Sequence, residues 1–363
     1  MIKKFISNCK KNLFTIFIMT FICVISIVSI IKKDTTFSSI ENKLLTQYKQ
    51  FSINSFFDKS YMDNLENYLS DQFPYRNELI CMNTYSKKYL LLEKNINKVY
   101  LGKNGYLFNS YTTMDFNNEQ IEKNINSLKY FQNKYNCKVY LIPSSFEILE
   151  QNLPFVHSNI NPNEYLKDIP NIDYVDNLLK PHKNEYIYYK TDHHWTTYGA
   201  YLLYKTEFDN NASYNTNVVS TNFLGTIHSR LNIKNSYDKI ESPTIGNNLF
   251  VKYDYTQNTN KLYYEEHLTT KDQYSYFLDG NHAIIEITNP NVENGHLLVI
   301  KDSFANCFVP FLTNDYHKID VIDMRYLNIP ISNILKNSNY DDIIVLYNKV
   351  NFMTDKHIYK LSK

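Results

Sequence analysis

The chain has few of the residues that mark disulfide-rich, zinc-binding or nucleic-acid-binding proteins. Its 363 residues include five Cys, seven Gly, one Trp and three Arg. Beyond the first thirty residues only Cys81, Cys137 and Cys307 remain, far apart and without a C-x-x-C pair, which argues against a zinc site or a disulfide framework. The 38 basic and 37 acidic side chains nearly cancel, so no nucleic-acid partner is expected.

What the chain does have is a large apolar fraction, in a length suited to a sizeable core. Hydrophobic residues make up 43% of the sequence, which excludes a mostly disordered protein. A chain of this length folds as one large domain or two small ones. There are 33 Tyr, and nothing in the sequence marks any one of them as functional.

The N-terminus carries a long apolar run from Leu13 to Ile31. At ~1.5 Å per residue it is long enough to cross a bilayer core, and the heavier positive flank precedes it. We therefore predict a cytoplasmic tail over 1–11, a single transmembrane anchor over 12–31 and a C-terminal part outside the cell. A cleaved signal peptide is one alternative, which the Ile-Ile-Lys-Lys end of the run suits poorly, and a lipid anchor on Cys23 is another.

The remainder is predicted to comprise a helical membrane-proximal region over 32–95 and an α/β domain over 96–363. In the first, apolar side chains recur at spacings of three and four, and Pro74 must interrupt any continuous helix. In the second, β-rich runs alternate with helix-like stretches, which is typical of an α/β fold with a largely parallel central sheet. The expected buried strands are 139–142, 186–189, 297–300, 319–322 and 343–346. A β-rich insertion or sheet extension near 245–290 is expected from runs at 249–255, 261–265 and 283–287.

The first concentration of reactive side chains is the run Thr-Asp192-His193-His194-Trp. In an extended segment residues two apart share a face, so Asp192 and His194 should point the same way and His193 elsewhere. A carboxylate beside an imidazole can fix its tautomer and stabilise the imidazolium, as a general base requires. The alternatives are a helix cap with surface histidines, or a manganese or zinc site. Since no second histidine cluster supplies further ligands, no metal is predicted.

The second concentration is Lys-Asp-Ser303, where the apolar strand 297–300 leads into a predicted helix over 304–312. A serine there lies at the positive end of a helix dipole, among unpaired backbone N–H groups that can stabilise an oxyanion. Asn306, one turn on, is a further candidate donor. Taken alone, the Asp-Ser pair favours an ordinary helix cap, by Asp302 or Ser303. Together with the first motif it supplies the nucleophile, base and orienting carboxylate of a serine acyl-transfer site.

These two motifs resemble the DHHW family of surface proteins, as do the blocks 71–76, 99–108 and 223–230. That family is similar to the alginate O-acetyltransferase-like domains of AlgJ and AlgX, which are SGNH-hydrolase-like. The resemblance implies an SGNH-hydrolase-like α/β sandwich.

The resemblance also implies roles for particular residues. The catalytic positions correspond to Ser303 as nucleophile and to Asp192 and His194 as the dyad. Lys190 and Arg325 match auxiliary polar positions. The chain departs from the alginate relatives at His193, where they have a small residue, so a second imidazole stands beside the expected base.

The function implied by the resemblance is that of a membrane-anchored, extracytoplasmic O-acetyltransferase acting on hydroxyls of a cell-surface polysaccharide, without a cofactor. Because acetyl-CoA is not expected outside the cell, a membrane-bound acyltransferase partner would supply the acetyl groups. Two alternatives stay open: a carbohydrate O-acetyl esterase that uses the same residues, and a non-catalytic surface protein that binds glycan or assists assembly.

Overall fold

The computed structural model describes residues 12–38, 40, 41, 43–246 and 248–363. The predicted cytoplasmic tail over 1–11 lies outside the described residues. Contacts within the chain divide it into two units, Met1–Ser86 and Lys87–Lys363.

The first unit contains the apolar helix α2, Leu13–Ile31, none of whose side chains is buried. By length and composition α2 is able to cross a membrane, a test that an anchor and a signal sequence both meet. Helices α4 and α5 are separated at Pro74, as predicted. The helical prediction is wrong for the described residues within 34–52, which form short strands and extended chain. The other elements of this region are β1 (Phe37–Ser38), β2 (Lys43–Leu44), α3 (Ile53–Phe57), α4 (Ser60–Asp71) and α5 (Arg76–Tyr89).

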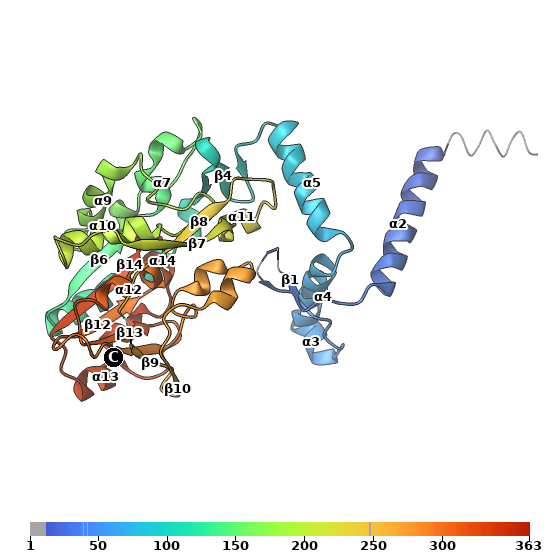
Figure 1. The fold of residues 1–363 in the computed structure, drawn as a ribbon. Helices are drawn as coiled ribbons and strands as arrows, with labels where there is room; N and C mark the ends of the chain where they lie inside the picture. The colour runs from blue at the N-terminus through green and yellow to red at the C-terminus, as the bar shows by residue number, and fades with distance from the viewer. Residues whose placement is uncertain (1–11, 39, 42, 247) are drawn as a thin grey trace, which may run out of the picture. The chain divides into compact units, whose positions relative to one another are not determined.

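A seven-stranded mixed sheet forms the centre of the second unit (Figure 1), in the order β10-β9-β11-β13-β12-β14-β6. The pairings β13–β12, β12–β14 and β14–β6 are parallel, and the other three are antiparallel. The prediction of a largely parallel sheet is therefore right for only half of it, because the β-rich segment near 245–290 extends the same sheet with antiparallel strands. The strands are β6 (Lys138–Ile142), β9 (Phe250–Tyr253), β10 (Gln257–Thr259), β11 (Ile284–Thr288), β12 (His296–Lys301), β13 (Lys318–Asp323) and β14 (Asp342–Asn348).

Two smaller sheets accompany the central one. The ribbon of β3 (Asn95–Ile96), β4 (Val99–Leu101) and β5 (Leu107–Asn109) is antiparallel. A second antiparallel pair, β7 (Thr216–Phe223) with β8 (Asp238–Pro243), was not among the predicted strands.

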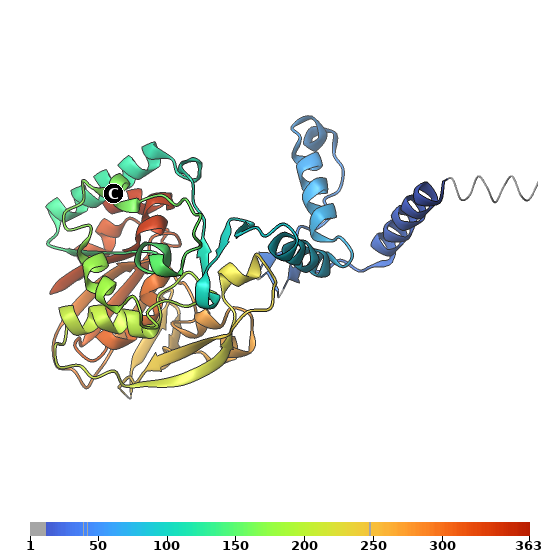
Figure 2. The ribbon, with the colours of Figure 1, turned by 90° about the horizontal axis from the view of Figure 1, so that it is seen from above.

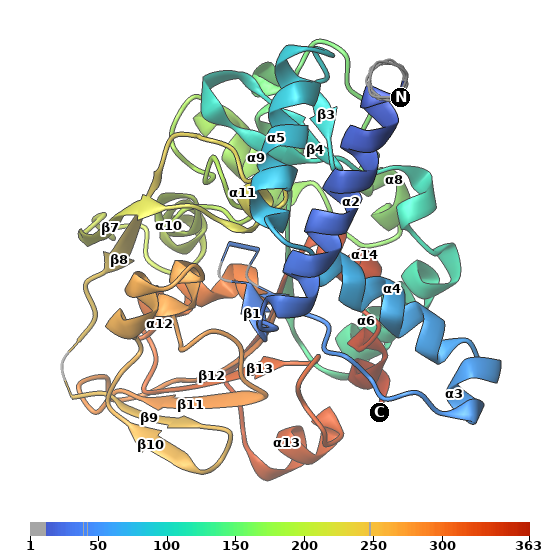
Figure 3. The ribbon, with the colours of Figure 1, turned by 90° about the vertical axis from the view of Figure 1, so that its right-hand side faces the viewer.

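Helices cover both faces of the central sheet, because its parallel strands are apolar on both sides. On β12, Leu297 and Val299 belong to one core cluster, while Leu298 and Ile300 belong to the other. Figure 2 shows α6 and α10 on opposite sides of the strands. The helices of this unit are α6 (Asn118–Lys134), α7 (Ser145–Ile148), α8 (Pro162–Leu166), α9 (Tyr174–Leu179), α10 (Thr197–Glu207), α11 (Thr226–Ser229), α12 (Val309–Leu312), α13 (Ile331–Asn337) and α14 (Lys349–Thr354). The arrangement is a mixed α/β fold, in which β9, β10 and β11 lie beside β12 and β13 (Figure 3).

Two predicted strands are not strands. Residues 186–189 are buried but fold back on the following loop, with Thr196 N–H donating to Ile187 O at 2.9 Å. Residues 261–265 make only the isolated bridge between Tyr263 and Phe277. In the first case the run bonds to the loop that follows it. In the second, Leu262 and Tyr264 are buried and bond to the backbone of Leu278 and Tyr276, outside the named strands.

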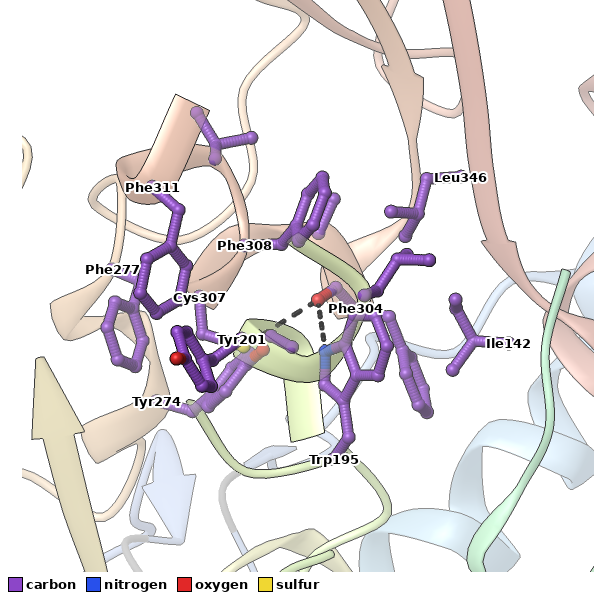
Figure 4. Close-up of a cluster of buried hydrophobic side chains, with 14 of the residues drawn as sticks. Ile142, Trp195, Tyr201, Tyr274, Phe277, Phe304, Cys307, Phe308, Phe311 and Leu346 are labelled. Carbon is purple, nitrogen blue, oxygen red and sulfur yellow. Dashed lines mark hydrogen bonds between the residues drawn. The ribbon is translucent and has the colours of Figure 1, made fainter. Parts of the chain in front are cut away.

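The single Trp lies in the centre of one core cluster (Figure 4). Trp195 is fully buried, packs near Phe304 and Phe308, and donates its Nε1 proton to Phe304 O at 2.8 Å. The bond satisfies the one polar atom of a large buried ring. This contact joins the loop before α10 to the turn after β12.

Removing the Phe308 ring should destabilise the second unit. Phe308 is fully buried and lies edge-on to Phe208 at 5.8 Å, so Phe308→Ala should lower the free energy of unfolding by about 3–5 kcal/mol. Trp195 fluorescence during urea unfolding of the full chain in detergent would measure it. Phe155→Ala is the matched control, since that ring is fully exposed. Equal stability of the two variants would contradict the packing described.

Candidate functional site

Ser303 lies at the carboxyl end of β12, where a parallel strand delivers the chain to the edge of the sheet. It is the first residue of a short 3-10 turn, η7 (Ser303–Cys307), and is partly exposed. The continuous helix predicted over 304–312 is wrong: η7 ends before α12, in which Pro310 has no N–H to continue the ladder. The turn nevertheless presents the serine at the sheet edge, as expected.

Asp302 secures this turn from inside the protein. Its Oδ1 accepts the N–H of Phe304 at 2.9 Å, and its Oδ2 accepts the N–H of Asn348 at 2.9 Å and the side-chain amide of Asn351 at 2.7 Å. The helix-cap alternative is therefore correct for Asp302. Because the same carboxylate also binds the end of β14, it holds the Ser303 turn against the neighbouring strand.

The histidine motif reaches Ser303 from a loop more than one hundred residues earlier in the chain. His194 Nε2 lies 2.8 Å from Ser303 Oγ, and His194 Nδ1 lies 2.6 Å from Asp192 Oδ1. The network assigns the ring proton to Nδ1, because a carboxylate only accepts, and leaves Nε2 to accept from the hydroxyl. The three predicted residues are thus connected in the order carboxylate, imidazole, hydroxyl.

Asp192 is held by a second set of hydrogen bonds. Its Oδ2 accepts the backbone N–H of Thr226 at 2.7 Å and the hydroxyl of the same residue at 3.0 Å, and its Oδ1 accepts the N–H of His194 at 3.1 Å. Gly225 lies against the carboxylate so closely that a Cβ there would be 2.2 Å from the Asp192 Cβ. The start of α11 therefore orients the carboxylate, and it requires glycine to do so.

The His194 ring is stacked on one aromatic neighbour and lies against a second, tilted ring. Tyr274 is nearly parallel to it at 3.9 Å and donates its hydroxyl proton to Ser303 O at 3.2 Å. His193 lies 3.9 Å from the same ring. The prediction that His193 points elsewhere is wrong, because residues 190–194 form bends and not the extended segment on which the alternation depends.

Burial and charge separate the protonation states of these groups. Burial favours a raised pKa for Asp192, but the adjacent imidazoles and the bonds from His194 and Thr226 outweigh it and lower the pKa. Burial, together with repulsion from His194, lowers the pKa of His193 to about 3. At neutral pH the site therefore contains an ionised Asp192 and a neutral His193, whose Nδ1 is bonded to Thr226 Oγ1 at 2.8 Å.

Among the auxiliary residues predicted from the sequence, Asn306, Lys190 and Arg325 have side-chain partners other than Ser303. Asn306 donates its amide protons to Gly280 O and Asn281 Oδ1 and accepts from Lys301 Nζ, so its amide is fully occupied. Its predicted role as oxyanion donor is not supported by this geometry.

Lys190 and Arg325 are likewise engaged elsewhere. The Lys190 ammonium lies 5.7 Å from the centre of the Tyr106 ring. Arg325 forms a two-pronged pair with the buried carboxylate of Asp323, Nε to Oδ1 at 2.9 Å and Nη2 to Oδ2 at 2.5 Å. Both contacts are structural interactions of the surrounding loops.

The metal alternative has a geometric basis, since Asp192, His193 and His194 each offer a ligand atom within 4.8 Å of the others. The donor set fits a metal poorly, however. Both Asp192 oxygens already accept from His194 and Thr226, and His194 Nδ1 is turned to the carboxylate. A cation there would have to displace those bonds.

Tyr274, Thr226 and Gly225 were missed by reasoning from the sequence. Tyr274 is one of 33 Tyr, and its neighbours carry no motif. Thr226 and Gly225 do lie in the block 223–230 of the family resemblance, so a signal for their importance was present, but not for the contact they make.

The comparisons with known proteins agree with the resemblance drawn from the motifs. Residues 155–322 match the DHHW protein family. A crystal structure of a DHHW family protein from Eubacterium siraeum is similar, with 20% sequence identity over 73% of this chain and 95% of that chain, at a TM-score of 0.60. The predicted similarity to the DHHW family is confirmed. No curated protein matches the chain.

Two further solved structures extend the comparison. Bacillus cereus PatB1 with a sulfonyl adduct has 20% identity over 74% of this chain and all of that chain (100%), with a TM-score of 0.58. The O-acetyltransferase domain of Pseudomonas putida AlgJ has 13% identity over 73% of this chain and 98% of that chain, with a TM-score of 0.41. At these identities the likeness to the DHHW protein and PatB1 is a likeness of fold.

Replacing Gly225 should disturb Asp192 directly. The added methyl group of Gly225→Ala must displace the carboxylate or α11, which should lower the free energy of unfolding by about 1–3 kcal/mol. Urea unfolding followed by Trp195 fluorescence would measure the change. Gly246→Ala is the control, because its nearest non-neighbouring atom is 3.5 Å from the new Cβ. A Gly225 variant as stable as the control would refute the close approach.

Acid should destabilise the folded chain through His193. An unfolded His titrates near ~6.5, whereas the pKa of His193 in the folded chain is lowered to about 3. Between these values the unfolded chain binds the extra proton, so the free energy of unfolding rises with pH in this window. His193→Gln should show a shallower rise in urea titrations at a series of pH values. Burial also lowers the pKa of His228, which therefore contributes the same slope to the wild type and the variant. An equally steep rise in the two proteins would contradict the prediction for His193.

Proposed function

We propose that this chain is a membrane-anchored, extracytoplasmic O-acetyltransferase that moves an acetyl group to a hydroxyl of a cell-surface polysaccharide. The observation that carries the proposal is the bond of 2.8 Å between Ser303 Oγ and His194 Nε2, continued at 2.6 Å to Asp192. A hydroxyl paired with an oriented imidazole is an activated nucleophile. The fold shared with PatB1, which was solved with a sulfonyl adduct, is consistent with it.

In the first half of the reaction His194 Nε2 takes the proton of Ser303 as Oγ attacks the acetyl carbonyl. Asp192 stabilises the imidazolium that forms. Collapse of the tetrahedral intermediate breaks the bond to the donor's leaving group, which takes the proton from His194. The product of this half is an acetyl ester on Ser303.

In the second half a sugar hydroxyl gives its proton to His194 and attacks the ester carbonyl. The bond from the acetyl carbon to Ser303 Oγ breaks, and the serine recovers the proton. The donor is an acetyl ester or thioester presented by a membrane-bound acyltransferase partner, since the anchor proposed for 12–31 keeps the enzyme at the membrane with its C-terminal part outside.

The backbone N–H of Ser303 is the oxyanion donor that we propose for both halves. Phe304 N–H is bonded to the Asp302 side chain and Ala305 N–H to the Asp302 carbonyl, so neither is free. The Ser303 N–H has no partner among the described residues. One such donor lowers the barrier by roughly 3 kcal/mol.

We also propose that the chain after the anchor consists of two regions with different roles. Residues 32–95 form a membrane-proximal region whose helices are α3, α4 and α5, and residues 96–363 form the SGNH-like domain that contains the reaction site. The apolar helix α2 is long enough for the anchor.

A sulfonyl fluoride should label Ser303 and no other serine of the full chain in detergent. Mass spectrometry of digests would locate the adduct, and release of p-nitrophenol from p-nitrophenyl acetate would give the turnover rate. His194→Ala should lower both rates at least roughly a hundredfold, because it removes the base. His193→Ala should retain most of the rate, since that ring does not contact Ser303.

His182→Ala is the control for these variants, because His182 is partly exposed and its ring pairs with Glu185. Acetyl transfer to an oligosaccharide supports the transferase, while release of acetate alone would identify an esterase. Absence of both labelling and turnover in the wild type would contradict the proposal and favour a non-catalytic glycan-binding protein.

A further inference from the structure

A polar cavity lies near the same end of the central sheet as Ser303. It has a volume of about 600 Å³ and opens between α7, α8, α9 and the chain that connects them. This volume is within the ~300–1,000 Å³ range of small-molecule sites. Its lining residues are Phe146, Glu147, Glu150, Leu153, His157, Ser158, Asn159, Ile160, Asn161, Asn163, Asp176 and Lys180.

The floor of this cavity is a charge cluster in which one lysine faces two carboxylates. Lys349 is fully buried and bonds to Asp176 Oδ1 at 2.5 Å and to Asn163 Oδ1 at 2.6 Å, with Glu147 Oε1 at 3.5 Å. Buried charges of this kind are stable only when they are paired. Burial raises the pKa of Glu147 to about 7, so near neutral pH the floor carries at most one net negative charge and offers no positive site for an anion.

The walls of the cavity offer a balanced set of unused polar groups. The Glu150 carboxylate and the Lys180 ammonium have no hydrogen-bond partner among the described residues, while the Ser158 side chain is bonded to Tyr100. His157 donates from Nδ1 to Pro154 O at 2.8 Å, which leaves Nε2 as an acceptor. Phe146 and Leu153 contribute apolar surface between these groups.

Two neighbouring residues connect the cavity with the Ser303 turn. Asn348 ends β14 and donates its N–H to Asp302, next to Ser303, while Lys349, the next residue, lies under the cavity floor. Phe146 lines both the cavity and a small pocket whose walls include His193 and Phe304. Phe146 is thus shared by the cavity and by a small pocket next to the Ser303 turn.

We infer that this cavity binds a sugar unit of the acceptor glycan adjacent to the unit that is acetylated. Mixed donors and acceptors suit hydroxyls, which do both, and the apolar wall suits the C–H face of a sugar ring. The lining contains three carboxylates, one lysine and no Arg, which disfavours a polyanion. The inference rests on the proposed function for its link to acetylation, but sugar binding is measured independently.

The test uses the full chain in detergent and two uncharged tetrasaccharides, of N-acetylglucosamine and of glucose, with a heparin tetrasaccharide as the polyanionic comparison. Calorimetry should detect at least one uncharged tetramer in the millimolar range and weaker or no binding of heparin. Glu150→Ala and Lys180→Ala should each weaken binding of that tetramer about tenfold, the loss expected for one good hydrogen bond. Glu122→Ala, exposed on α6, is the matched control.

Labelling of Ser303 by the sulfonyl fluoride separates the two proposals. The cavity variants should be labelled at the wild-type rate, because they leave the reacting groups untouched. Tetramer binding without labelling of the wild type would contradict acyl transfer and still support the sugar site. No tetramer binding by the wild type, or affinity unchanged by both cavity substitutions, or tighter binding of heparin, would overturn the sugar site.

Discussion

The arrangement of the reacting groups depends on the packing of the loop around Trp195 against the turn around Phe304. The hydrogen bond from Trp195 Nε1 to Phe304 O joins these two segments. Trp195 and Phe304 directly follow His194 and Ser303 in sequence, so aligning one pair aligns the other. The bond is buried where no water can replace it, and losing it would leave a donor unsatisfied. The large apolar ring and its one polar atom therefore determine both how tightly and in which register the segments meet.

The carboxyl edge of the parallel strands brings the other parts together. Asp302 follows β12 and Asn348 ends β14, and the bonds between them hold two strand ends at one height. Ligand sites of open α/β sheets lie at this edge because the loops there can vary while the strands stay rigid. The same edge supports the Ser303 turn on one side and, through Lys349, the polar cavity on the other.

Predictions from the sequence were accurate where a short-range pattern determines the outcome, and wrong where a distant partner does. The apolar runs of β12, β13 and β14 predict buried strands because burial on both faces requires them. The run at 186–189 is similar in composition but forms backbone hydrogen bonds with the loop that follows it. Composition alone does not indicate which segment a strand-like run pairs with. Pro310 was visible in the sequence, yet its interruption of the helix after Ser303 was not anticipated.

The sequence by itself determined the candidate nucleophile, base and carboxylate, since Ser303, His194 and Asp192 have chemistry that few other residues supply. It also determined the apolar N-terminal helix, because nineteen residues of that hydropathy need no partner to be recognised. Only the tertiary structure decided that His193 lies against the His194 ring and that Tyr274 stacks on that same ring. It also decided that the Asn306 amide oxygen accepts from Lys301. The physical reason is that a side chain's reactivity is local, whereas its neighbours are chosen by how remote segments pack.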